Sequence, residues 1–395
     1  MNPDLALTRP YPFSRLKKLL EGAQLPAGKK HISLSIGEPK HPAPSSVLNE
    51  LYHNFELFEI YPSTNGMPEL REAIASWNLR RHGVKLNPAT QILPVNGSRE
   101  ALFSFTQAAI DSSKNPTVLM PCPFYQIYEG AAIMAGAKPV YIPTTAENDF
   151  VMDLESSASE EELQSAQLVF VCSPSNPTGK VLGLAHWKKL FELADKYNFI
   201  IASDECYSEI YFDENNPPLG ALQAAKILGR DDFDKLVVFS SLSKRSNIPG
   251  MRTGFVAGDA KLLKPYLLYR TYHGCAMSGP LQKASIIAWN DEEHVKENRR
   301  LYREKFEAGL PLVQQTLEVE MPDASFYLWA KTPIDDKVFT RRLYEEAGIT
   351  VLPGSFLGRE LANGINPGSG YVRIALVATT EEVKEATQRI AEFKI

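Results

Sequence analysis

The stretch QLVFVCSPSNPTGKVLGLAHWKKLFELADKYNFIIASD, residues 167–204, contains the pattern that decides the fold. It begins and ends with short apolar runs, residues 167–172 and 199–202, which are typical of buried strands. Between them, residues 185–197 place apolar side chains three and four positions apart, as on one face of a helix. A strand, a helix and a second strand in this order predict two parallel neighbours in one sheet.

The same alternation extends over the middle of the chain. Further buried strands are predicted at residues 92–95, 117–120 and 235–239, and further helices at residues 99–110 and 124–135. The fold class is therefore α/β, with a mostly parallel sheet covered by helices. In such sheets, ligands bind at the carboxyl ends of the strands.

The chain changes character after about residue 291. Residues 291–308 carry dense charge of both signs, which predicts a long solvent-facing helix that bridges two domains. Beyond it, strands are predicted at residues 325–331 and 371–375, and helices at residues 336–347 and 381–393. This mixture indicates a second, smaller α+β unit.

Length and composition exclude several classes of protein. A chain of 395 residues exceeds one small module, and its hydrophobic (44%) and charged (23%) fractions are those of a globular protein. The net charge of −5, with both signs mixed, argues against nucleic acid or an anionic membrane as partner. The four cysteines lack C-x-x-C spacing, and no stretch resembles a signal peptide or a membrane span. We expect a cytoplasmic protein with reduced thiols and no metal site.

Lys244 is the first candidate for chemistry, because it follows the strand predicted at residues 235–239. Most lysines are solvated surface charges. A lysine at the end of a buried strand is partly desolvated, which lowers its pKa and leaves a neutral amine able to attack a carbonyl. Arg252 follows after a Pro-Gly turn that can bring its guanidinium back toward the lysine, and an arginine beside Ser241 suits a phosphate dianion.

Four further polar features are candidate parts of a binding site. Asp204 ends a predicted strand and is either a turn former or an anion directed into a cleft. Asn176 lies in SNPTG, which is either an ordinary turn or part of a site. The loop at residues 96–100 (NGSRE) joins a strand to a helix, whose free N–H groups can hold an anion. Arg373, in an apolar strand, forms either a buried salt bridge or a carboxylate-binding site.

Taken in order, these motifs resemble those of the class I and II aminotransferases, which are pyridoxal-phosphate enzymes of fold type I. The resemblance covers nearly the whole chain. It rests on NGS at residues 96–98, NPTG at 176–179, Asp204 with Tyr207, SLSK ending at Lys244, Arg252 and Arg373.

The resemblance implies a role for each residue at the reacting end of the cofactor. Lys244 would hold pyridoxal 5′-phosphate as a Schiff base and then move a proton between the substrate α-carbon and the cofactor C4′. Asp204 would pair with the pyridinium nitrogen. Asn176 and Tyr207 would donate hydrogen bonds to the phenolate oxygen.

The resemblance also implies how phosphate and substrate are held. The phosphate would be bound by Ser98, the backbone N–H of Arg99, Ser241 and Arg252, with Tyr61 entering from the second subunit of a homodimer. Tyr125 would stack on the cofactor ring. Arg373 would bind the substrate α-carboxylate beside Asn176 and the backbone of Gly37.

Within the family, four stretches resemble the proteobacterial N-succinyldiaminopimelate aminotransferases. They are RPYPFSRLKKLL (residues 9–20), SLSIGEPKHPAP (33–44), LPVNGSREALF (93–103) and SKRSNIPGMR (243–252). The implied reaction converts N-succinyl-LL-2,6-diaminopimelate and 2-oxoglutarate to N-succinyl-2-amino-6-oxopimelate and glutamate, in lysine and diaminopimelate biosynthesis. Both substrates carry a remote carboxylate, so a second cation is needed, for which Arg15, Lys40 and Arg99 are candidates.

Other activities remain open at this point. They are an aspartate, alanine or aromatic aminotransferase, a pyridoxal-phosphate lyase on the same fold, and a ligand-sensing regulator. A regulator is disfavoured because the residues before Pro39 are too few and too weakly basic for a DNA-binding segment. The chain departs from the family pattern at Arg245, Ser246, Asn247 and Thr253, but these departures remove no required group.

The implied roles also predict how the domains are built. Gly37 and Arg373 must meet at one substrate although they lie near opposite ends of the chain. We therefore expect a large cofactor-binding domain at residues 45–290. The small domain would be discontinuous, made of residues 1–44 and 291–395.

Overall fold

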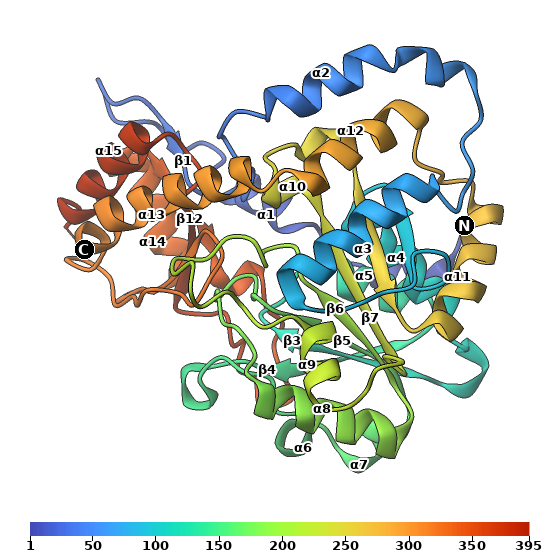
Figure 1. Ribbon diagram of the computed structural model, residues 1–395. Coiled ribbons are helices and arrows are strands. Elements are labelled where there is room, and N and C mark those ends of the chain that lie inside the picture. Colours follow the sequence, from blue (N-terminus) through green and yellow to red (C-terminus); the bar gives the residue numbers. More distant parts are fainter. Residues whose placement is uncertain (395) are drawn as a thin grey trace.

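The computed structural model describes residues 1–394, and its centre is a seven-stranded sheet (Figure 1). The strands are β2 (Ile92–Val95), β3 (Thr117–Cys122), β4 (Lys138–Pro143), β5 (Ala166–Cys172), β6 (Ile200–Asp204), β7 (Leu236–Ser241) and β8 (Gly254–Gly258). Their order is β2-β8-β7-β6-β5-β3-β4. All neighbours are parallel except β8, which runs antiparallel to β2 and β7. The predicted α/β class is confirmed.

Two strands of this sheet, β4 and β8, were not predicted from the sequence. β4 (KPVYIP) contains two prolines, which are tolerated because it lies at the sheet edge. β8 begins and ends with glycine, a pattern that indicates a turn. In the sheet these glycines allow close approach to β7: a Cβ on Gly254 would lie 2.4 Å from the carbonyl oxygen of Ser240.

Helices cover both faces of the sheet. On one face lie α3 (Pro68–His82), α8 (Leu184–Tyr197), α9 (Ala221–Ile227) and α12 (Gly279–Asn290), which share one hydrophobic core. On the other lie α4 (Ser98–Ala109), α5 (Ile127–Met134) and α11 (Ala260–His273), which share a second core. Successive strand residues alternate between the two cores, as the pleat of a strand requires.

Short elements complete this part of the chain. They are α2 (Ser45–His53), α6 (Leu154–Ser157), α7 (Glu160–Gln164) and α10 (Leu242–Arg245), with the 3₁₀ turns η2 (Phe55–Glu59), η3 (Ser112–Lys114), η4 (Ala146–Asn148) and η5 (Pro249–Met251). α2 packs on α12 along the upper margin of the molecule in Figure 1.

Residues 12–34 join the C-terminal part of the chain in a smaller α+β unit. A three-stranded antiparallel sheet has the order β11-β12-β9, and β1 pairs in parallel with β10. The strands are β1 (Ile32–Ser33), β9 (Tyr327–Lys331), β10 (Ile349–Thr350), β11 (Leu352–Pro353) and β12 (Tyr371–Ala375). Its helices and 3₁₀ turn are α1 (Pro12–Leu19), α13 (Glu293–Val313), α14 (Asp336–Ala347), η6 (Gly354–Phe356) and α15 (Thr380–Ala391). The N-terminal 3₁₀ turn η1 (Pro3–Leu7) packs instead on α5, beside the large sheet.

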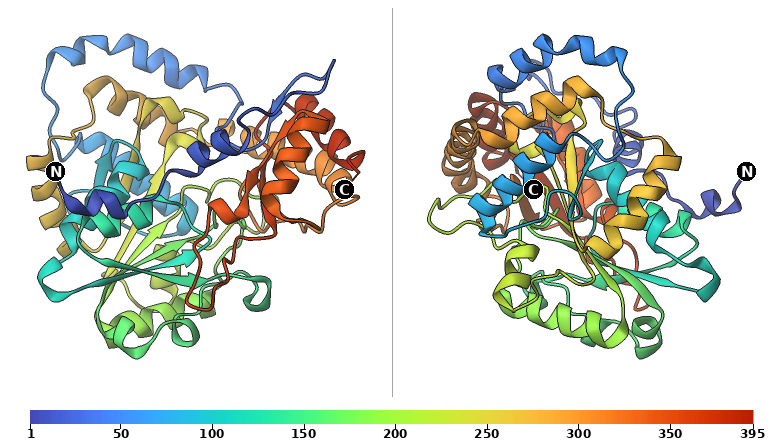
Figure 2. Two further views of the ribbon diagram at one scale, coloured as in Figure 1. Left: turned by 180° about the vertical axis from the view of Figure 1, so that it is seen from behind. Right: turned by 45° about the vertical axis from the view of Figure 1, so that its right-hand side comes forward.

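The N-terminal segment contributes directly to the core of this unit. Ile32 and Leu34 are buried in the same cluster as Phe339 and Ile349. Figure 2 shows the blue N-terminal segment crossing the molecule to the red C-terminal elements. These contacts support the proposed division into a large domain and a discontinuous small domain.

The charged helix after residue 291 differs from its prediction. α13 begins at Glu293 and ends at Val313, and one of its faces is buried rather than solvent-facing. Arg299 on that face is 4% exposed, because it pairs with Glu214 at 2.7 Å and Glu209 at 3.4 Å. The density of charged residues predicted that the helix is exposed. Arg299 is buried instead, because carboxylates from another segment neutralise its charge.

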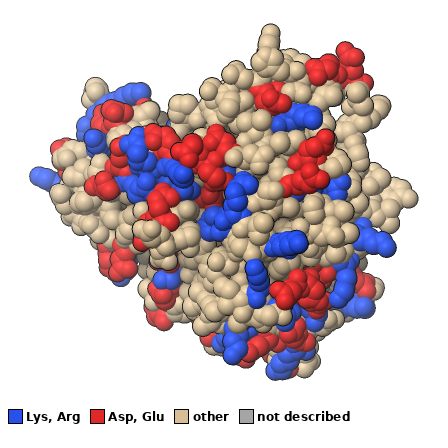
Figure 3. All heavy atoms as spheres, viewed as in Figure 1, with Lys and Arg blue, Asp and Glu red and all other residues tan. Residues whose placement is uncertain are grey.

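The surface shows no segregation of charge on the face drawn in Figure 3, where acidic and basic side chains are interspersed. Within residues 1–394, none of the helices combines the length and the apolar composition that a bilayer crossing requires.

Candidate active site

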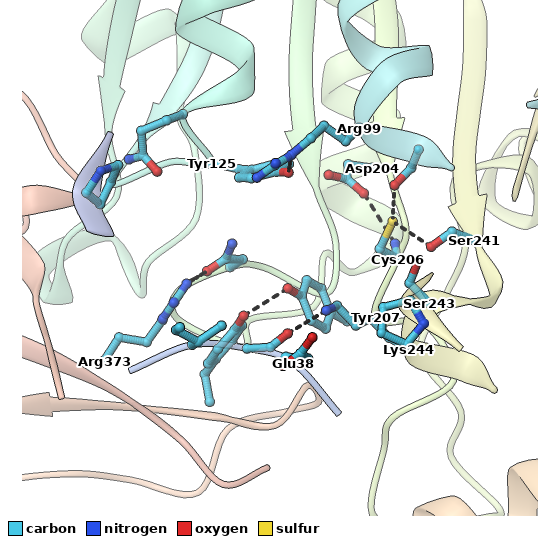
Figure 4. Close-up of a pocket in the computed structure, with 18 of the residues that line it drawn as sticks. Glu38, Arg99, Tyr125, Asp204, Cys206, Tyr207, Ser241, Ser243, Lys244 and Arg373 are labelled. Carbon is cyan, nitrogen blue, oxygen red and sulfur yellow. Dashed lines mark hydrogen bonds between the residues drawn. The ribbon is translucent and has the colours of Figure 1, made fainter. Parts of the chain in front are cut away.

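A cavity of about 480 Å³ lies at the carboxyl ends of β5, β6 and β7 (Figure 4). Asn176 follows β5, Asp204 ends β6 and Ser241 ends β7, so three parallel strands deliver their terminal residues to one place. The predicted site residues that line it are Gly37, Ser98, Arg99, Tyr125, Asn176, Asp204, Tyr207, Ser241, Lys244, Arg252 and Arg373. Elements far apart in the sequence therefore build a single site.

Lys244 lies in α10, directly after β7. Its Nζ donates a hydrogen bond to the backbone carbonyl of Gly37 at 2.5 Å. Burial lowers the pKa of Lys244 to about 8, and the positive charges of Arg373 and Arg252 also lower it. The sequence predicted that the Lys244 amine is desolvated, and in the structure it is. The amine contacts Gly37, whose backbone the resemblance places beside the substrate.

Asp204 is 4% exposed at the end of β6. It accepts hydrogen bonds from the Tyr128 hydroxyl at 2.8 Å and from the backbone N–H of Cys206 at 3.3 Å. Burial raises the pKa of Asp204. No cationic side chain of residues 1–394 forms an ion pair with it, so a cation beside it, such as a protonated ring nitrogen, would stabilise its charged form.

An anion-binding arrangement lies at the start of α4. Gly97, at φ +86°, precedes the helix, and a Cβ there would lie 2.4 Å from Nη2 of Arg252. The Arg252 guanidinium donates only to backbone carbonyls among the described residues, those of Pro249 at 2.9 Å and Asn96 at 3.4 Å. A cation without a carboxylate partner at a helix N-terminus suits a phosphate dianion.

Two hydroxyls complete this end of the cavity. The Ser98 and Ser241 hydroxyls lie 2.9 Å and 3.7 Å from the Cys206 sulfur, and both side chains line the cavity. Their roles as phosphate ligands stay a prediction.

Arg373 lies in β12 and is 4% exposed. It donates to Asn176 Oδ1 at 2.8 Å and to the Ser35 carbonyl at 2.9 Å, while its buried Nε has no partner in the described part of the chain. The alternative of a buried salt bridge is wrong for these residues, because no carboxylate pairs with Arg373. Asn176 uses its carbonyl on this arginine, which leaves its amide N–H groups free to donate into the cavity.

Several lining residues were missed by sequence reasoning. Tyr327 in β9 exchanges a 3.0 Å hydrogen bond with the Tyr207 hydroxyl, and its ring lies 4.2 Å from the Arg373 guanidinium. Tyr11 reaches the cavity from the N-terminal segment. The sequence could have predicted Cys206 as a lining residue, since it lies between the predicted site residues Asp204 and Tyr207. Tyr11 and Tyr327 had none, because only tertiary contacts bring them to the site.

Other predicted or noted residues lie elsewhere. Tyr61 is fully exposed in this chain and does not line the cavity, so its role across a dimer interface stays a prediction. Arg15 stacks on Phe356 at 4.1 Å, and Lys40 pairs with Glu38 at 2.8 Å; neither lines the cavity. The family departures, Arg245, Ser246, Asn247 and Thr253, also lie outside its lining.

The residues present fit a planar phosphate-bearing cofactor with a carbonyl group. A low-pKa amine can attack the carbonyl, and an unpaired buried carboxylate can hold a protonated ring nitrogen. A helix N-terminus with Arg252 can hold the phosphate. The unused Nε of Arg373 then remains for the carboxylate of a second molecule.

Comparisons with known proteins identify the family of this chain. The family described as aminotransferase class I and II matches residues 29–390. The LL-diaminopimelate aminotransferase of Aquifex aeolicus is 34% identical over 99% of this chain and 98% of its own length, and that of Nitratidesulfovibrio vulgaris is 32% identical over 98% of each.

Solved structures agree as well. An aminotransferase from Neisseria meningitidis superposes with a TM-score of 0.96 at 53% identity and covers 99% of both chains. A probable N-succinyldiaminopimelate aminotransferase from Thermus thermophilus superposes with a TM-score of 0.82 at 27% identity, over 96% of this chain and 99% of that one.

Proposed function

Since the chain belongs to the class I and II aminotransferases, whose cofactor is pyridoxal 5′-phosphate, we propose that it transfers an amino group from N-succinyl-LL-2,6-diaminopimelate to 2-oxoglutarate. The products are N-succinyl-2-amino-6-oxopimelate and glutamate, and the reaction belongs to lysine and diaminopimelate biosynthesis. The name of the similar Thermus protein supports this substrate.

One observation carries the reaction type. A single cavity joins a lysine with a pKa of about 8, a buried carboxylate without a cationic partner, and an arginine with a free buried Nε. These are the base, the ring-nitrogen partner and the carboxylate ligand that transamination needs.

Each residue has a defined task in this proposal. Pyridoxal phosphate, when bound, supplies an electron-accepting ring that stabilises negative charge at the substrate α-carbon. Arg373 binds the α-carboxylate and thereby orients the α-carbon toward Lys244. Lys244 takes the α-proton, for which a pKa near the working pH is well matched. Asp204, a buried carboxylate, favours the protonated state of the ring nitrogen.

LL-diaminopimelate itself is the second candidate donor. The names of the curated relatives at 32–34% identity favour it. The two donors differ at the remote end, where LL-diaminopimelate carries an ammonium group and the succinylated compound carries an additional carboxylate instead. Aspartate, alanine and aromatic donors, and a lyase reaction, are outcomes that the experiment below distinguishes.

The proposal includes a homodimer. α2, η2 and the two residues that follow η2 expose a set of large apolar side chains, Leu48, Tyr52, Phe55, Phe58, Ile60 and Tyr61. Leu48 also lines a groove of about 1160 Å³ that shares Arg99 and Arg252 with the active-site cavity. A second copy covering this surface could bring its own Tyr61 to the phosphate end. A reducing compartment is also part of the proposal, because all four cysteines are free.

A half-reaction screen tests the substrate. The yellow holoenzyme is mixed with N-succinyl-LL-diaminopimelate, LL-diaminopimelate, aspartate, alanine or phenylalanine, and the cofactor absorbance is followed. We expect the fastest change with the succinylated compound. Faster conversion of LL-diaminopimelate would replace the donor, and release of ammonia would indicate a lyase.

Borohydride treatment tests the assignment of Lys244. Reduction of the holoenzyme should attach the cofactor to a peptide that contains Lys244, and Lys244→Ala should lose this attachment and nearly all transamination. Attachment to another lysine would contradict the assignment.

A further inference from the structure

A second polar cavity, of about 300 Å³, lies where the N-terminal segment meets the C-terminal part of the chain. It shares no lining residue with the active-site cavity. Four of the side chains that line it are cationic, Arg9, Arg15, Lys337 and Arg359, and one exposed side chain, Glu360, is acidic. An excess of positive charge around so small a space favours an anionic ligand.

Two of these cations, Arg9 and Arg15, have no counter-charge in contact with them. Neither forms an ion pair within residues 1–394, and the Arg15 guanidinium stacks on the Phe356 ring at 4.1 Å. Burial lowers the pKa of Arg15, and the positive charges of Arg359 and Arg9 lower it further. The Asp336 carboxylate acts in the opposite direction. Repulsion among the guanidinium groups therefore favours an anion bound between them.

Ser355 provides a buried donor that faces this cavity. The residue is 7% exposed and lines the cavity, and its hydroxyl has no hydrogen-bond partner in the described part of the chain. Its backbone N–H is already used, since it donates to the Asp336 carboxylate at 2.9 Å. A buried hydroxyl without a partner is unfavourable, so a ligand oxygen that accepts from it would be stabilised.

The C-terminal wall of the cavity is held in place by other contacts. The Arg359 guanidinium donates to both carboxylate oxygens of Glu129, at 2.6 and 2.5 Å, and to the carbonyl of Gly358 at 2.8 Å. Two of its five N–H groups have no acceptor among residues 1–394. The Asn366 amide donates to the Ser355 carbonyl at 3.0 Å. Donors fixed in this way lose little conformational freedom when they bind an anion.

The N-terminal wall leads directly to the active site. Arg9 and Arg15 flank residues 11–13, all three of which line the active-site cavity. An anion that contacts these two arginines and Ser355 at once would connect the N-terminal segment to the C-terminal part of the chain. It would thereby hold residues 11–13 in the wall of the active-site cavity.

We propose that this cavity is a second anion-binding site, for a small multivalent oxyanion such as inorganic phosphate or a tricarboxylate, and that the bound anion holds residues 9–15 in place beside the active site. Arg9, Arg15 and Ser355 are its ligands, and Arg359 forms the positively charged wall behind them. The inference depends neither on the identity of the amino donor nor on the transamination reaction.

Calorimetry of the holoenzyme with inorganic phosphate, at constant ionic strength, tests the site. Its dissociation constant should rise about 10- to 100-fold in Arg9→Gln and in Arg15→Gln, because each variant loses a charged hydrogen bond. Ser355→Ala should weaken binding about 10-fold. Since Arg9 is exposed, its replacement leaves the fold intact.

Two variants serve as controls. Lys17→Gln removes an exposed charge from the same helix as Arg15, outside the lining of the cavity, and should bind phosphate as the wild type does. Arg373→Gln should also keep phosphate binding, because Arg373 lies in the other cavity. Citrate in place of phosphate shows which oxyanion binds more tightly, and either result supports the site if Arg15→Gln abolishes the preference.

Hydrogen exchange tests the effect on the N-terminal segment. Phosphate should slow the exchange of backbone amides in residues 9–20 about 10-fold in the wild type, and should not do so when Arg9→Gln and Arg15→Gln are combined. Equal phosphate affinities of the wild type and both single variants, loss of binding in Arg373→Gln, or unchanged exchange would each overturn the proposal. An enzyme that transaminates none of the proposed donors would refute the proposed function and leave these results unaffected.

Discussion

The charge of Lys244 shows how burial sets the chemistry of a single residue. The pKa of its amine falls from 10.5 to about 8 because the cavity walls remove it from water. Below pH 8 the folded chain must hold a poorly solvated charge. The same desolvation that makes Lys244 a useful base therefore lowers the stability of the apoenzyme.

Replacing Lys244 by the uncharged residue of similar size should stabilise the apoenzyme. At pH 7, Lys244→Met should raise the free energy of unfolding by about 1–3 kcal/mol, given ~1.4 kcal/mol per pKa unit and some solvation of the amine by cavity water. The unfolded chain binds more protons than the folded one between pH 8 and 10.5, so the wild-type stability rises through this window and the gap closes.

Urea denaturation at pH 7 and pH 10 measures this difference. Lys40→Met is the control, because Lys40 is exposed and forms only a surface pair with Glu38, and its effect should stay within about 0.5 kcal/mol. A Lys244→Met apoenzyme that is less stable than the wild type at pH 7 would contradict the role given to burial.

At the scale of elements, the approach of β8 to β7 positions the two ends of the cofactor site. Lys244 follows β7 and Arg252 precedes β8, so the spacing of these strands controls the distance between the amine and the guanidinium. Gly254 permits this spacing, since a Cβ there would lie 2.4 Å from the Ser240 carbonyl and 3.2 Å from Ser241.

Adding one methyl group at Gly254 should disturb both strands. We expect Gly254→Ala to cost about 1–3 kcal/mol in the free energy of unfolding, because its Cβ meets backbone that cannot move without separating β7 from β8. Gly250→Ala, in the same connection, has no atom within 4 Å of the added Cβ and should stay within about 0.5 kcal/mol. Equal stabilities of the two variants in thermal unfolding would refute this explanation.

α13 gives a second prediction at this scale. Arg299→Ala leaves Glu209 buried with Arg81, at 2.7 Å, as its remaining ion-pair partner, and should destabilise the protein by about 2–4 kcal/mol. Arg300→Ala removes only exposed pairs with Glu297 and Glu304 on the same helix and should cost less than about 0.5 kcal/mol. Chemical denaturation of both variants provides the comparison, and similar losses would show that burial does not strengthen the Arg299 contacts.

At the scale of the whole molecule, the exposed apolar side chains of α2 and η2 lead to a prediction about assembly. A charge within this surface, Phe58→Asp, should convert the proposed dimer to monomer and weaken cofactor binding, because burying an unpaired carboxylate in an interface is costly. Val338→Asp, at a similarly exposed apolar residue on α14, is the control. Sedimentation equilibrium measures the mass of each, and a wild-type monomer with full activity would refute the dimer.

Tyr61→Phe tests whether the partner completes the phosphate site. Removing one hydroxyl that donates to a charged group should weaken cofactor affinity by about 10- to 100-fold without changing the mass of the dimer. Spectrophotometric titration of the apoenzyme measures it. Unaltered affinity would remove Tyr61 from the site.

The α/β class, the ends of the central strands and the site residues that follow them were predictable from the sequence. Alternating apolar runs predict the strands that deliver Asn176, Asp204 and Lys244, because periodicity and strand termini are local properties of the chain. The edge strand β4 and the glycine-flanked strand β8 were not predicted. Their residues favour a strand only in their places in the sheet, β4 at the edge beside β3 and β8 between β2 and β7.

The tertiary structure alone decided which distant residues meet. The sequence offered Arg15, Lys40 and Arg99 equally for the remote carboxylate, and only the fold shows that Arg99 faces the cavity while Lys40 is paired with an acid and Arg15 lies outside the cavity. The fold also brings Tyr11 and Tyr327 to the cavity. It excludes the salt-bridge interpretation of Arg373, which has no carboxylate partner among the described residues. The physical reason is that the availability of a charge depends on its neighbours in space, which no local pattern records.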